Sequence, residues 1–443
     1  MKNILLTGAT GFIGRHLISA LLKEGHHITA CSRNPDRLQD LQGVNLTVVA
    51  IDFSKAISPH DWIAHLEGID VVINAAGIIT ETATQSFNDI HTNAPVALFN
   101  ACVEANVNRV IQISVLGADA QTGKDDVATM SHYHQSKQAA DDVLMSLPLD
   151  WWVLRPSIIY GDGAKSMGLF RALSMLPIVL LVGSGKQFIQ PIHIDNVVAS
   201  TLISVASIDA KKQLDLVGSS VISYVSFMQK IRDWLSNSEI GLSSKLRSIN
   251  LTIPLATTLS KVGRWINEPS LNPQSINMLA QSKVYNVAAV EKHLQRSLPS
   301  FDHYLQHNPA TQAQRWHSRV YFLRPIMRFF LAVVWVWTGV VSAFLYPQDQ
   351  SYQLLSAVGI SGAFLPVMLY SAVIIDVVLG FLVLFAWRVR LIAQAQIGLI
   401  LVYTIIISIA LPEFWLHPFG PILKNIPLLV YILIWSTLEE QKP

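Results

Sequence analysis

The first 160 residues alternate short, uninterrupted apolar runs with longer stretches in which apolar residues recur at helical spacing. An uninterrupted apolar run is typical of a strand buried on both faces, as in a parallel sheet covered by helices. The pattern therefore predicts an α/β doubly wound, Rossmann-type parallel sheet. We expect strands at 3–7, 28–32, 46–51, 71–75, 110–114 and 151–154, and helices between them that include 12–24, 95–105 and 133–145.

Residues 160–310 are less regular and richer in Ser, Asn and Pro. Their two apolar segments, 173–182 and 249–259, are shorter than the roughly 20 residues that a membrane span requires. We therefore expect these segments to line the core or the pocket of a small substrate subdomain. The nucleotide-binding domain would then occupy 1–310, followed by a polar linker at 311–325.

Residues beyond 325 contain four long apolar stretches, at 329–346, 364–387, 391–411 and 419–435. The first three are long enough to cross a hydrocarbon core of about 30 Å, whereas a lysine, an asparagine and a proline interrupt the fourth. A buried helical hairpin is the alternative, but these segments are apolar on all sides rather than along one stripe. Trp and Tyr also lie mostly towards the segment ends, as at membrane interfaces. The pattern predicts an all-α four-helix transmembrane domain at 326–443.

The distribution of charged residues supports the same division of the chain near residue 325. Charged residues make up 14% of the sequence and hydrophobic residues 51%, and only five acids and five bases fall within 326–443. The formal net charge of +2 argues against nucleic acid as a partner, because nucleic-acid binding needs a concentrated basic face. Cys31 and Cys102 lie far apart without metal-ligand spacing, so we expect neither a metal site nor a disulfide framework.

A glycine-rich motif, TGATGFIG at 7–14, follows the first expected strand and opens the first expected helix. Gly8 permits the tight turn, Gly11 lets the backbone approach a pyrophosphate, and Gly14 allows close packing of helix and strand. The backbone N–H groups at the helix start, including those of Phe12 and Ile13, would face the phosphates. The motif in this context predicts a dinucleotide site.

The second expected strand ends in Cys31, Ser32 and Arg33, with no acid before Asp36. NAD-binding sites usually place an acid here to hold the ribose 2′-hydroxyl. Arg33 would instead clasp a 2′-phosphate, with a hydrogen bond from Ser32. A solvated surface arginine is the alternative. We therefore expect NADP(H) to be preferred over NAD(H).

Several motifs together resemble those of the extended or atypical short-chain dehydrogenases/reductases. They cover roughly residues 1–300 in the order of the family: TGATGFIG at 7–14, NAAG at 74–77, Ser114, Y-x-x-x-K at 133–137, LRPSIIYG at 154–161 and PIHID at 191–195. Within that superfamily the chain most resembles the branch that contains the nucleotide-binding accessory subunit of respiratory complex I. The apolar tail resembles the DoxX-like membrane domain.

The resemblance implies further cofactor contacts and supporting residues. Asn93 would match a helix asparagine that steadies the site, and His193 would fall in a motif that supports the fold. The implied cofactor contacts are Asp52 and Phe53 beside the adenine, Ala75, Ala76 and Gly77 along the pyrophosphate and ribose, and Pro156, Ser157 and Ile158 near the nicotinamide.

Tyr133 and Lys137 are four residues apart on an expected helix and therefore share one face. A lysine ammonium nearby would lower the pKa of the phenol, which is otherwise about 10. We expect Tyr133 to act as general acid and base, Lys137 to tune it and anchor the ribose, and Ser114 to hydrogen-bond a substrate carbonyl. Chance occurrence of Y-x-x-x-K is the alternative, and the complex I branch keeps the nucleotide fold without known turnover.

Three other polar residues, His132, His134 and Asp376, are candidates for supporting or functional roles. His132 and His134 flank the tyrosine but point to other faces of the helix, so solvated or supporting roles are favoured. Asp376 falls near the middle of the second apolar stretch, where a carboxylate is costly and often functional. A structural partner for Tyr370, Gln394 or another polar group in the bundle is the equal alternative.

These features favour a membrane-anchored NADP(H)-dependent oxidoreductase that acts on a carbonyl, hydroxyl or quinone-like group of a small lipophilic substrate. A non-catalytic dinucleotide-binding assembly or sensor protein is the main alternative, and a transporter or scaffold with a regulatory domain is a third. The lipid bilayer is the expected partner, and a further membrane protein is left open.

The distribution of bases predicts the orientation in the cell (inner) membrane. Short cytoplasmic loops gather Lys and Arg. The loop at 347–362 has neither, whereas four arginines precede the first span and Arg388 and Arg390 follow the second. We therefore expect a multi-pass protein with its dehydrogenase domain in the cytoplasm.

Overall fold

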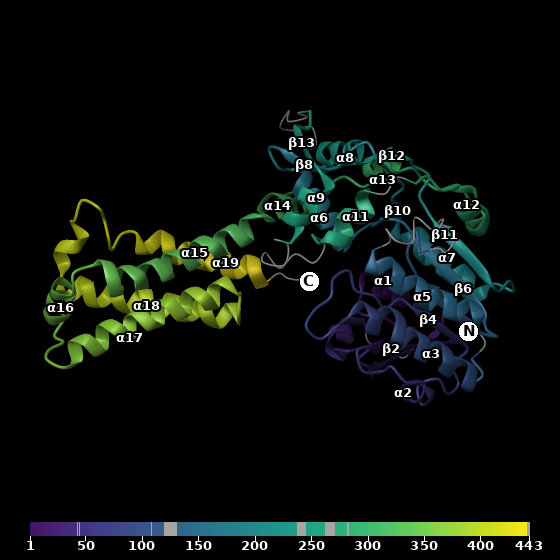
Figure 1. Ribbon diagram of the computed structural model, residues 1–443, viewed down its shortest axis with the longest axis horizontal. Coiled ribbons are helices and arrows are strands. Elements are labelled where there is room, and N and C mark those ends of the chain that lie inside the picture. The colour runs from purple at the N-terminus through teal and green to yellow at the C-terminus, as the bar shows by residue number, and fades with distance from the viewer. Residues whose placement is uncertain are drawn as a thin grey trace. The chain divides into compact units, whose positions relative to one another are not determined.

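A computed structural model describes residues 1–41, 43, 45–107, 109–118, 131–236, 245–261, 271–280 and 283–440 (Figure 1). The chain divides into two compact units, an N-terminal unit, Met1–Ser318, and a C-terminal unit, Arg319–Pro443. The division falls within the segment that we expected to be a linker, but helix α14 (Gln312–Val320) occupies much of that segment.

A seven-stranded sheet forms the centre of the N-terminal unit. Its order is β11-β6-β5-β4-β1-β2-β3, and all neighbouring strands are parallel. The predicted doubly wound fold is confirmed. The strands are β1 (Asn3–Thr7), β2 (His27–Ser32), β3 (Leu46–Ala50), β4 (Val71–Asn74), β5 (Arg109–Ile113), β6 (Asp150–Pro156) and β11 (Lys212–Leu216).

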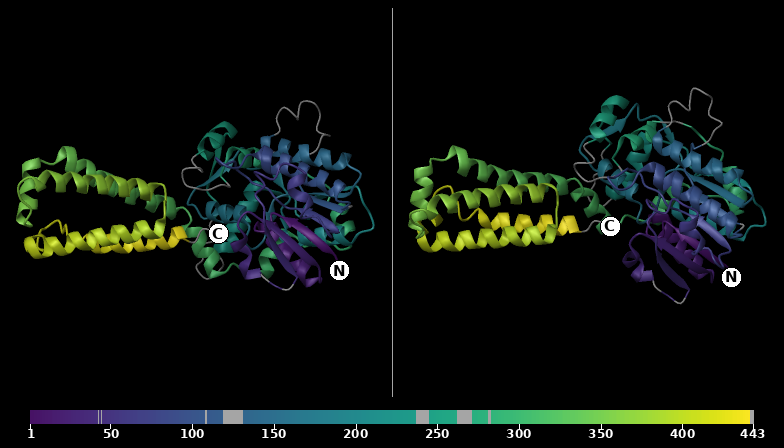
Figure 2. Two further views of the ribbon diagram at one scale, coloured as in Figure 1. Left: turned by 90° about the horizontal axis from the view of Figure 1, so that it is seen from below. Right: turned by 60° about the horizontal axis from the view of Figure 1, so that its bottom comes forward.

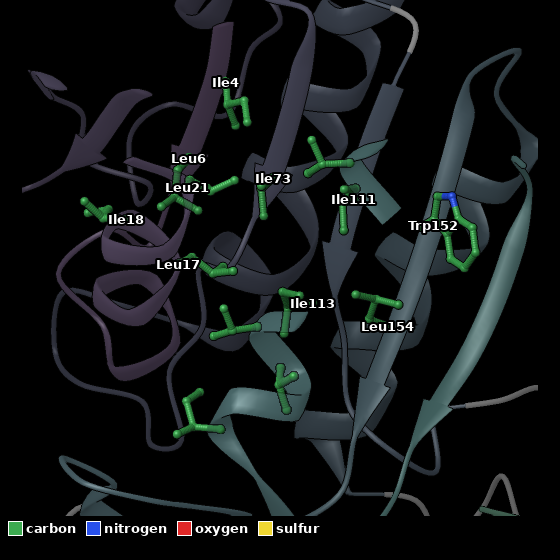
Figure 3. Close-up of a cluster of buried hydrophobic side chains, with 14 of the residues drawn as sticks. Ile4, Leu6, Leu17, Ile18, Leu21, Ile73, Ile111, Ile113, Trp152 and Leu154 are labelled. Atoms are coloured by element: carbon green, nitrogen blue, oxygen red, sulfur yellow. The ribbon is translucent and has the colours of Figure 1, made fainter. Parts of the chain in front are cut away.

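Helices cover both faces of this sheet, because successive strand residues point to opposite sides. Ile4 and Leu6 pack in one cluster with Leu17, Ile18 and other residues of the first face (Figure 3), whereas Leu5 packs in the other. The first face is covered by α1 (Phe12–Lys23), α7 (Ile194–Ala206) and α12 (Ala288–Leu294), and the second by α2 (His60–Ile63), α3 (Ala94–Glu104) and α5 (His132–Ser146).

A smaller subdomain is built around a separate aromatic core that includes Phe170, Phe227 and Phe301. The first apolar segment of this region, 173–182, contains the end of α6 (Lys165–Ser174) and all of β8 (Val179–Val182). The second, 249–259, contains most of β13 (Ser248–Leu251) and of α9 (Ile253–Ser260). The elements of the subdomain are β7 (Ile159–Tyr160), α6 (Lys165–Ser174), β8 (Val179–Val182), β9 (Phe188–Ile189), β10 (Ile192–His193), β12 (Ile222–Ser223), α8 (Tyr224–Ser236), β13 (Ser248–Leu251), α9 (Ile253–Ser260), α11 (Pro273–Ala280) and α13 (Phe301–His307).

The C-terminal unit is helical, and its long helices run side by side (Figure 2). Among the described residues, three helices are long and apolar enough to cross a membrane: Leu323–Leu345, Phe364–Leu384 and Val389–Ala410. The elements are α15 (Leu323–Val340), η3 (Val341–Leu345), α16 (Gln348–Ala357), α17 (Phe364–Leu384), α18 (Val389–Ala410), η4 (Pro412–Trp415) and α19 (Asn425–Glu440). The last helix is about 24 Å long by its helical rise, so a fourth crossing stays a prediction.

Close packing of α15 on α17 depends on two glycines. A Cβ on Gly380 would lie 2.6 Å from Val336 Cγ2, and one on Gly339 would lie 2.7 Å from Val377 Cγ2. Small residues let helix backbones approach in the absence of a hydrophobic driving force between helices in lipid. The indole N–H of Trp335 also donates to Gln396 Oε1 on α18 at 2.7 Å.

Candidate active site

The strand order of the sheet reverses between β1 and β4, which is where open α/β sheets bind ligands, beyond the carboxyl ends of the strands. The loops after these two strands touch. Gly8 has φ +67°, and a Cβ on it would lie 2.4 Å from Ala75 O. Below this contact, Thr7 Oγ1 donates to Asn74 Oδ1 at 2.5 Å. Only glycine fits at position 8.

The start of α1 completes a cradle of backbone donors. A Cβ on Gly14 would lie 2.2 Å from Gly8 O, so the helix begins directly against the loop. Its N-cap, Gly11, offers no side-chain acceptor, and Arg15 is the first residue whose amide bonds within this turn, to Gly11 O at 3.0 Å. In the described part of the chain, the amides of Phe12, Ile13 and Gly14 have no acceptor. Three free donors at a helix N-terminus fit a pyrophosphate.

Ser32 and Arg33 lie at the carboxyl end of β2, next to this cradle in the sheet order. Ser32 is buried, and its hydroxyl accepts the Asn34 N–H at 3.1 Å, which leaves its own proton available. Arg33 is exposed and makes no hydrogen bond or ion pair within the described residues. A guanidinium at this position is able to pair with a 2′-phosphate, and the preference for NADP(H) stays a prediction.

Asp52 and Phe53 follow β3. Asp52 Oδ1 accepts two hydrogen bonds from Ser54, from the N–H at 3.1 Å and the hydroxyl at 2.8 Å. Phe53 is buried, and its ring packs edge-on against Trp62 at 5.2 Å. Its ring therefore faces the core, and an adenine would meet its backbone rather than its side chain.

Lys137 ties α5 to the carboxyl ends of two strands. Its Nζ donates to Ala76 O and to Ile113 O, both at 3.1 Å, and the side chain is buried. Burial lowers the pKa of the ammonium to about 8 although Asp141 nearby raises it. A Cβ on Gly77 would lie 3.3 Å from this Nζ, so the loop after β4 also needs a small residue.

His91, which sequence reasoning missed, supports Tyr133 from the π-helix η2 (Asn88–Asn93). The Ile78 N–H donates to His91 Nε2 at 3.0 Å, so the proton sits on Nδ1 and is donated to Ser136 Oγ at 3.0 Å. The His91 ring stands edge-on to the phenol at 5.1 Å. Burial and the Lys137 charge lower the pKa of His91 to about 2, so the imidazole is neutral and structural.

Ser114 lies at the end of β5, but its hydroxyl donates to the carboxylate of Asp141 rather than pointing at a free space. Asp141 is buried one turn after Lys137 on the same face of α5. Burial raises the pKa of this carboxyl to about 7, although Ser114, Lys137 and Arg155 oppose the shift. A neutral Asp141 can itself donate to Ser114, which frees the serine proton for a substrate oxygen.

We expect the Asp141 carboxyl to make stability depend on pH. An unfolded aspartate titrates near 3.9, whereas the folded carboxyl titrates at about 7, so the folded state holds an extra proton between these values. Stability therefore falls as pH rises through this window. Asp141→Asn is neutral in both states and should gain on the order of a few kcal/mol over the native protein between about pH 5 and pH 8, measured by denaturant unfolding.

The exposed acid Glu104, replaced by Gln, serves as the control and should leave the profile unchanged. Parallel pH profiles for the native protein and Asp141→Asn would show that this carboxyl is not titrating in the window.

Residues expected near the nicotinamide follow β6. Pro156 is the last residue of that strand. Ser157 is anchored rather than free, because its hydroxyl donates to Gln190 O at 2.5 Å and its N–H donates to Leu216 O at 3.0 Å. Ile158 is partly buried against the aromatic core of the subdomain. The three residues thus border the subdomain on the carboxyl side of the sheet.

The remaining histidines and Asn93 make local contacts. His132 is exposed, whereas His134 is buried with its Nδ1 2.8 Å from Ser131 Oγ. His193 caps α7, where its Nδ1 accepts the Asp195 N–H at 3.3 Å. Asn93 Nδ2 donates to Asp89 Oδ1 at 3.0 Å on its own helix. Of these residues, His134 also contacts Tyr133, with the two rings edge-on at 5.7 Å.

Asp376 lies in α17 of the C-terminal unit and is 6% exposed. Its Oδ1 has no hydrogen bond among the described residues. Of the two partners that the sequence offered, Tyr370 instead accepts a hydrogen bond from Gln348 Nε2 at 2.8 Å. No hydrogen bond joins Asp376 to Tyr370 or Gln394 among the described residues, and the role of Asp376 stays a prediction.

The glycine cradle at the switch point, with Lys137 beside it, is the arrangement of an NAD(P)-binding domain. Residues 8–172 match the family model described as NAD(P)H-binding. Residues 332–433 match the DoxX-like family. The chain therefore contains a segment similar to NAD(P)H-binding domains and a segment similar to the DoxX-like family, and the predicted resemblance is confirmed.

Individual relatives agree with this class. Ceramide reductase of Caulobacter vibrioides is 29% identical over 197 residues, 44% of this chain and 58% of that protein. The mitochondrial NADH dehydrogenase [ubiquinone] 1 alpha subcomplex subunit 9 of Dictyostelium discoideum is 28% identical over 233 residues, 51% of this chain and 62% of that protein. The chain thus spans about three fifths of the length of these curated relatives.

Solved structures share the fold. UDP-glucuronic acid 4-epimerase from Bacillus cereus superposes with a TM-score of 0.52 at 16% identity, covering 72% of this chain and 99% of that one. At this identity the likeness shows the fold alone. The DoxX-like match and the three apolar helices indicate that the protein associates with a membrane.

Proposed function

We propose that this protein is a membrane-anchored, NADP(H)-dependent oxidoreductase that acts on a carbonyl, hydroxyl or quinone-like group of a lipophilic substrate. The observation that carries the proposal is the placement of Lys137, whose Nζ bridges Ala76 O and Ile113 O beside the glycine cradle, one helical turn from Tyr133. The apolar helices and the relative named ceramide reductase support a lipid as the substrate class.

Tyr133, Lys137 and Ser114 have separate roles in the proposed reaction. When bound, the dinucleotide supplies or accepts a hydride. Burial raises the pKa of Tyr133 to about 12, so in the reductive direction the phenol is protonated and donates to the developing alkoxide. The sequence predicted that the Lys137 ammonium lowers the pKa of this phenol, whereas in the structure burial raises it, so Lys137 is left with the role of ribose anchor. Ser114 orients the substrate oxygen once Asp141 is neutral.

The experiment that tests the proposal is NADPH oxidation by the full chain in lipid nanodiscs, assayed against a panel of long-chain ketones, sphingoid ketones and quinones. Oxidation that depends on one class of substrate supports the enzyme. NADPH binding without oxidation across the panel supports the second candidate, a dinucleotide-binding assembly or sensor protein, which the complex I subunit among the relatives favours.

We expect the protein to bind NADPH more tightly than NADH. Arg33 is exposed without a partner in the described structure, and a charge-assisted hydrogen bond to a phosphate contributes roughly 1.5–3 kcal/mol, or about tenfold to a hundredfold in affinity. Arg33→Asp should lower the affinity for NADPH by that factor and leave the affinity for NADH unchanged, as measured by fluorescence titration. Lys23→Asp, an exposed base at the far end of α1, is the matched control. Equal affinities in the native protein would refute the cofactor preference.

We propose that the dehydrogenase domain faces the cytoplasm of the cell (inner) membrane. The segment between the first two apolar helices, 347–362, has no Lys or Arg, whereas Arg388 precedes α18 and Arg390 lies in its first turn. Reporter fusions at Gln350 should therefore report the outside, and fusions after Pro443 the cytoplasm. A cytoplasmic signal at Gln350 would reverse the orientation, and an external signal after Pro443 would mean three crossings.

A further inference from the structure

We propose that one face of the small subdomain lies against the surface of an anionic lipid bilayer. The contact is made by exposed apolar side chains on or next to β8, β13 and α9, and by the bases that flank them. The apolar side chains are called the apolar patch, which consists of Ile178, Leu180, Ile249, Ile253, Leu255 and Leu259.

The strands β8 and β13 present half of the apolar patch on one side. Val179 and Leu181 of β8 are buried, whereas Leu180 between them is 40% exposed. Ile249 is the register partner of Leu180 and is 52% exposed, so the two side chains lie next to each other on the outer face. A polar residue is the usual occupant of such a face in water. Paired apolar side chains there indicate a surface that is covered in the working protein.

Helix α9 follows β13 directly and extends the patch. Ala256 and Ser260 form its buried side. Leu255 and Leu259 are one turn apart along the flank and are 48% and 43% exposed. The helix therefore exposes the larger apolar side chains and buries the smaller ones, which is the reverse of a water-facing helix.

The charges around the patch favour lipid as the occupant. Lys245, Arg247 and Lys261 are exposed, and the described stretch 245–261 contains no Asp or Glu. Apolar side chains rimmed by bases are typical of segments that lie in the headgroup region of anionic membranes. A second copy of the chain on the same face would bring these bases together and repel.

The patch lies at the end of the N-terminal unit from which the chain leaves that unit. Helix α14 is held against the loop before α6, because Gln314 Nε2 donates to Asp162 Oδ1 at 3.1 Å, and a Cβ on Gly168 of α6 would lie 3.7 Å from His317 Cε1. The α6 residues Met167 and Phe170 share a core with β8. The labels β8, β13, α9 and α14 accordingly stand at the same end of the N-terminal unit in Figure 1. The strand face and the exit of the chain thus lie at one end of this unit.

The bilayer contact does not rest on the proposed enzymatic function. If that function holds, the contact gives the subdomain expected to hold the substrate pocket direct access to lipid. If the protein is a non-catalytic sensor, the same face still binds the bilayer, and the test below requires no turnover.

The test uses the full chain in nanodiscs of phosphatidylcholine and phosphatidylglycerol, with a fluorophore on Leu255→Cys. The native cysteines, Cys31 and Cys102, are buried, and burial raises the pKa of both thiols to about 12, so labelling is selective. Ile208→Cys is the matched control, because Ile208 is 99% exposed and lies before β11, away from the patch. Quenching by nitroxide lipids and by aqueous iodide is compared at the two sites.

The proposal predicts quenching by nitroxide lipid several-fold stronger at position 255 than at position 208, and iodide quenching in the opposite order. Replacing Lys245, Arg247 and Lys261 by Glu should remove most of the difference. Equal quenching at the two sites would overturn the proposal. Protection from both quenchers would overturn the proposal, because it would mean that another part of this chain covers the patch. Self-quenching that rises with protein concentration would also overturn it, because it would mean that a second copy covers the patch.

Discussion

Replacing Gly8 with alanine will abolish the binding of both NADPH and NADH. The new Cβ would meet Ala75 O at 2.4 Å, on a residue whose φ of +67° already disfavours alanine. The loops after β1 and β4 must then separate, which removes the cradle at the switch point. Strain and displacement together should reduce affinity by at least about a hundredfold, equivalent to roughly 3 kcal/mol, measured by fluorescence titration.

Gly43→Ala is the matched control, because a Cβ at that position meets nothing within 4 Å. It should leave affinity and thermal unfolding unchanged. Gly11→Ala separates binding from folding, since its Cβ meets only Gly8 O, at 3.0 Å, and should weaken dinucleotide binding with a smaller loss of stability. Native affinity in Gly8→Ala would show that the dinucleotide binds elsewhere.

Tyr133→Phe will reduce turnover by about 10²- to 10⁴-fold, the usual contribution of a positioned general acid, while leaving NADPH affinity nearly unchanged. The phenylalanine keeps the ring contact with His91 and removes only the proton donor. Lys137→Ala should damage both properties, because it leaves Ala76 O and Ile113 O without their donor and removes the ribose anchor. Steady-state kinetics and titration of each variant provide the measurement.

His132→Ala is the control for the tyrosine variant, since His132 is the exposed neighbour on the same helix. It should retain native kcat and KM. If Tyr133→Phe keeps most of the activity, the proton must come from another group, and Asp141 with Ser114 would be the next to examine.

The sheet and the glycine cradle were predictable from local pattern. Buried parallel strands carry uninterrupted apolar runs, and the six strands expected for the sheet match the observed ones within two residues at each end. The seventh, β11, was missed because it is an edge strand with the polar sequence Lys-Gln-Leu-Asp-Leu and carries little of the apolar signal. Gly8 and Gly14 were identifiable because their role is backbone geometry, which sequence spacing reports directly.

The supporting residues of the site were not predictable in the same way. Asp141 lies one turn beyond Lys137, so its helix face was known, but its bond to Ser114 depends on how α5 packs across β5. His91 comes from a π-helix with no sequence pattern of its own. Phe53 was expected beside the adenine, yet Trp62 packs against its ring in the core. Such pairings are made by tertiary contacts between segments far apart in the chain.

The most direct measurement is the transfer of deuterium to a lipid. The full chain in nanodiscs, loaded with lipid extract and supplied with NADPH deuterated at the nicotinamide C4 position, should yield a reduced lipid carrying one deuterium on the former carbonyl carbon, detected by mass spectrometry. Tyr133→Phe should yield about a hundredth of that product or less. NADPH that remains bound and unconsumed, with neither a deuterium-labelled lipid nor newly formed quinol in the extract, would contradict the assignment of this protein as an oxidoreductase with a lipophilic substrate.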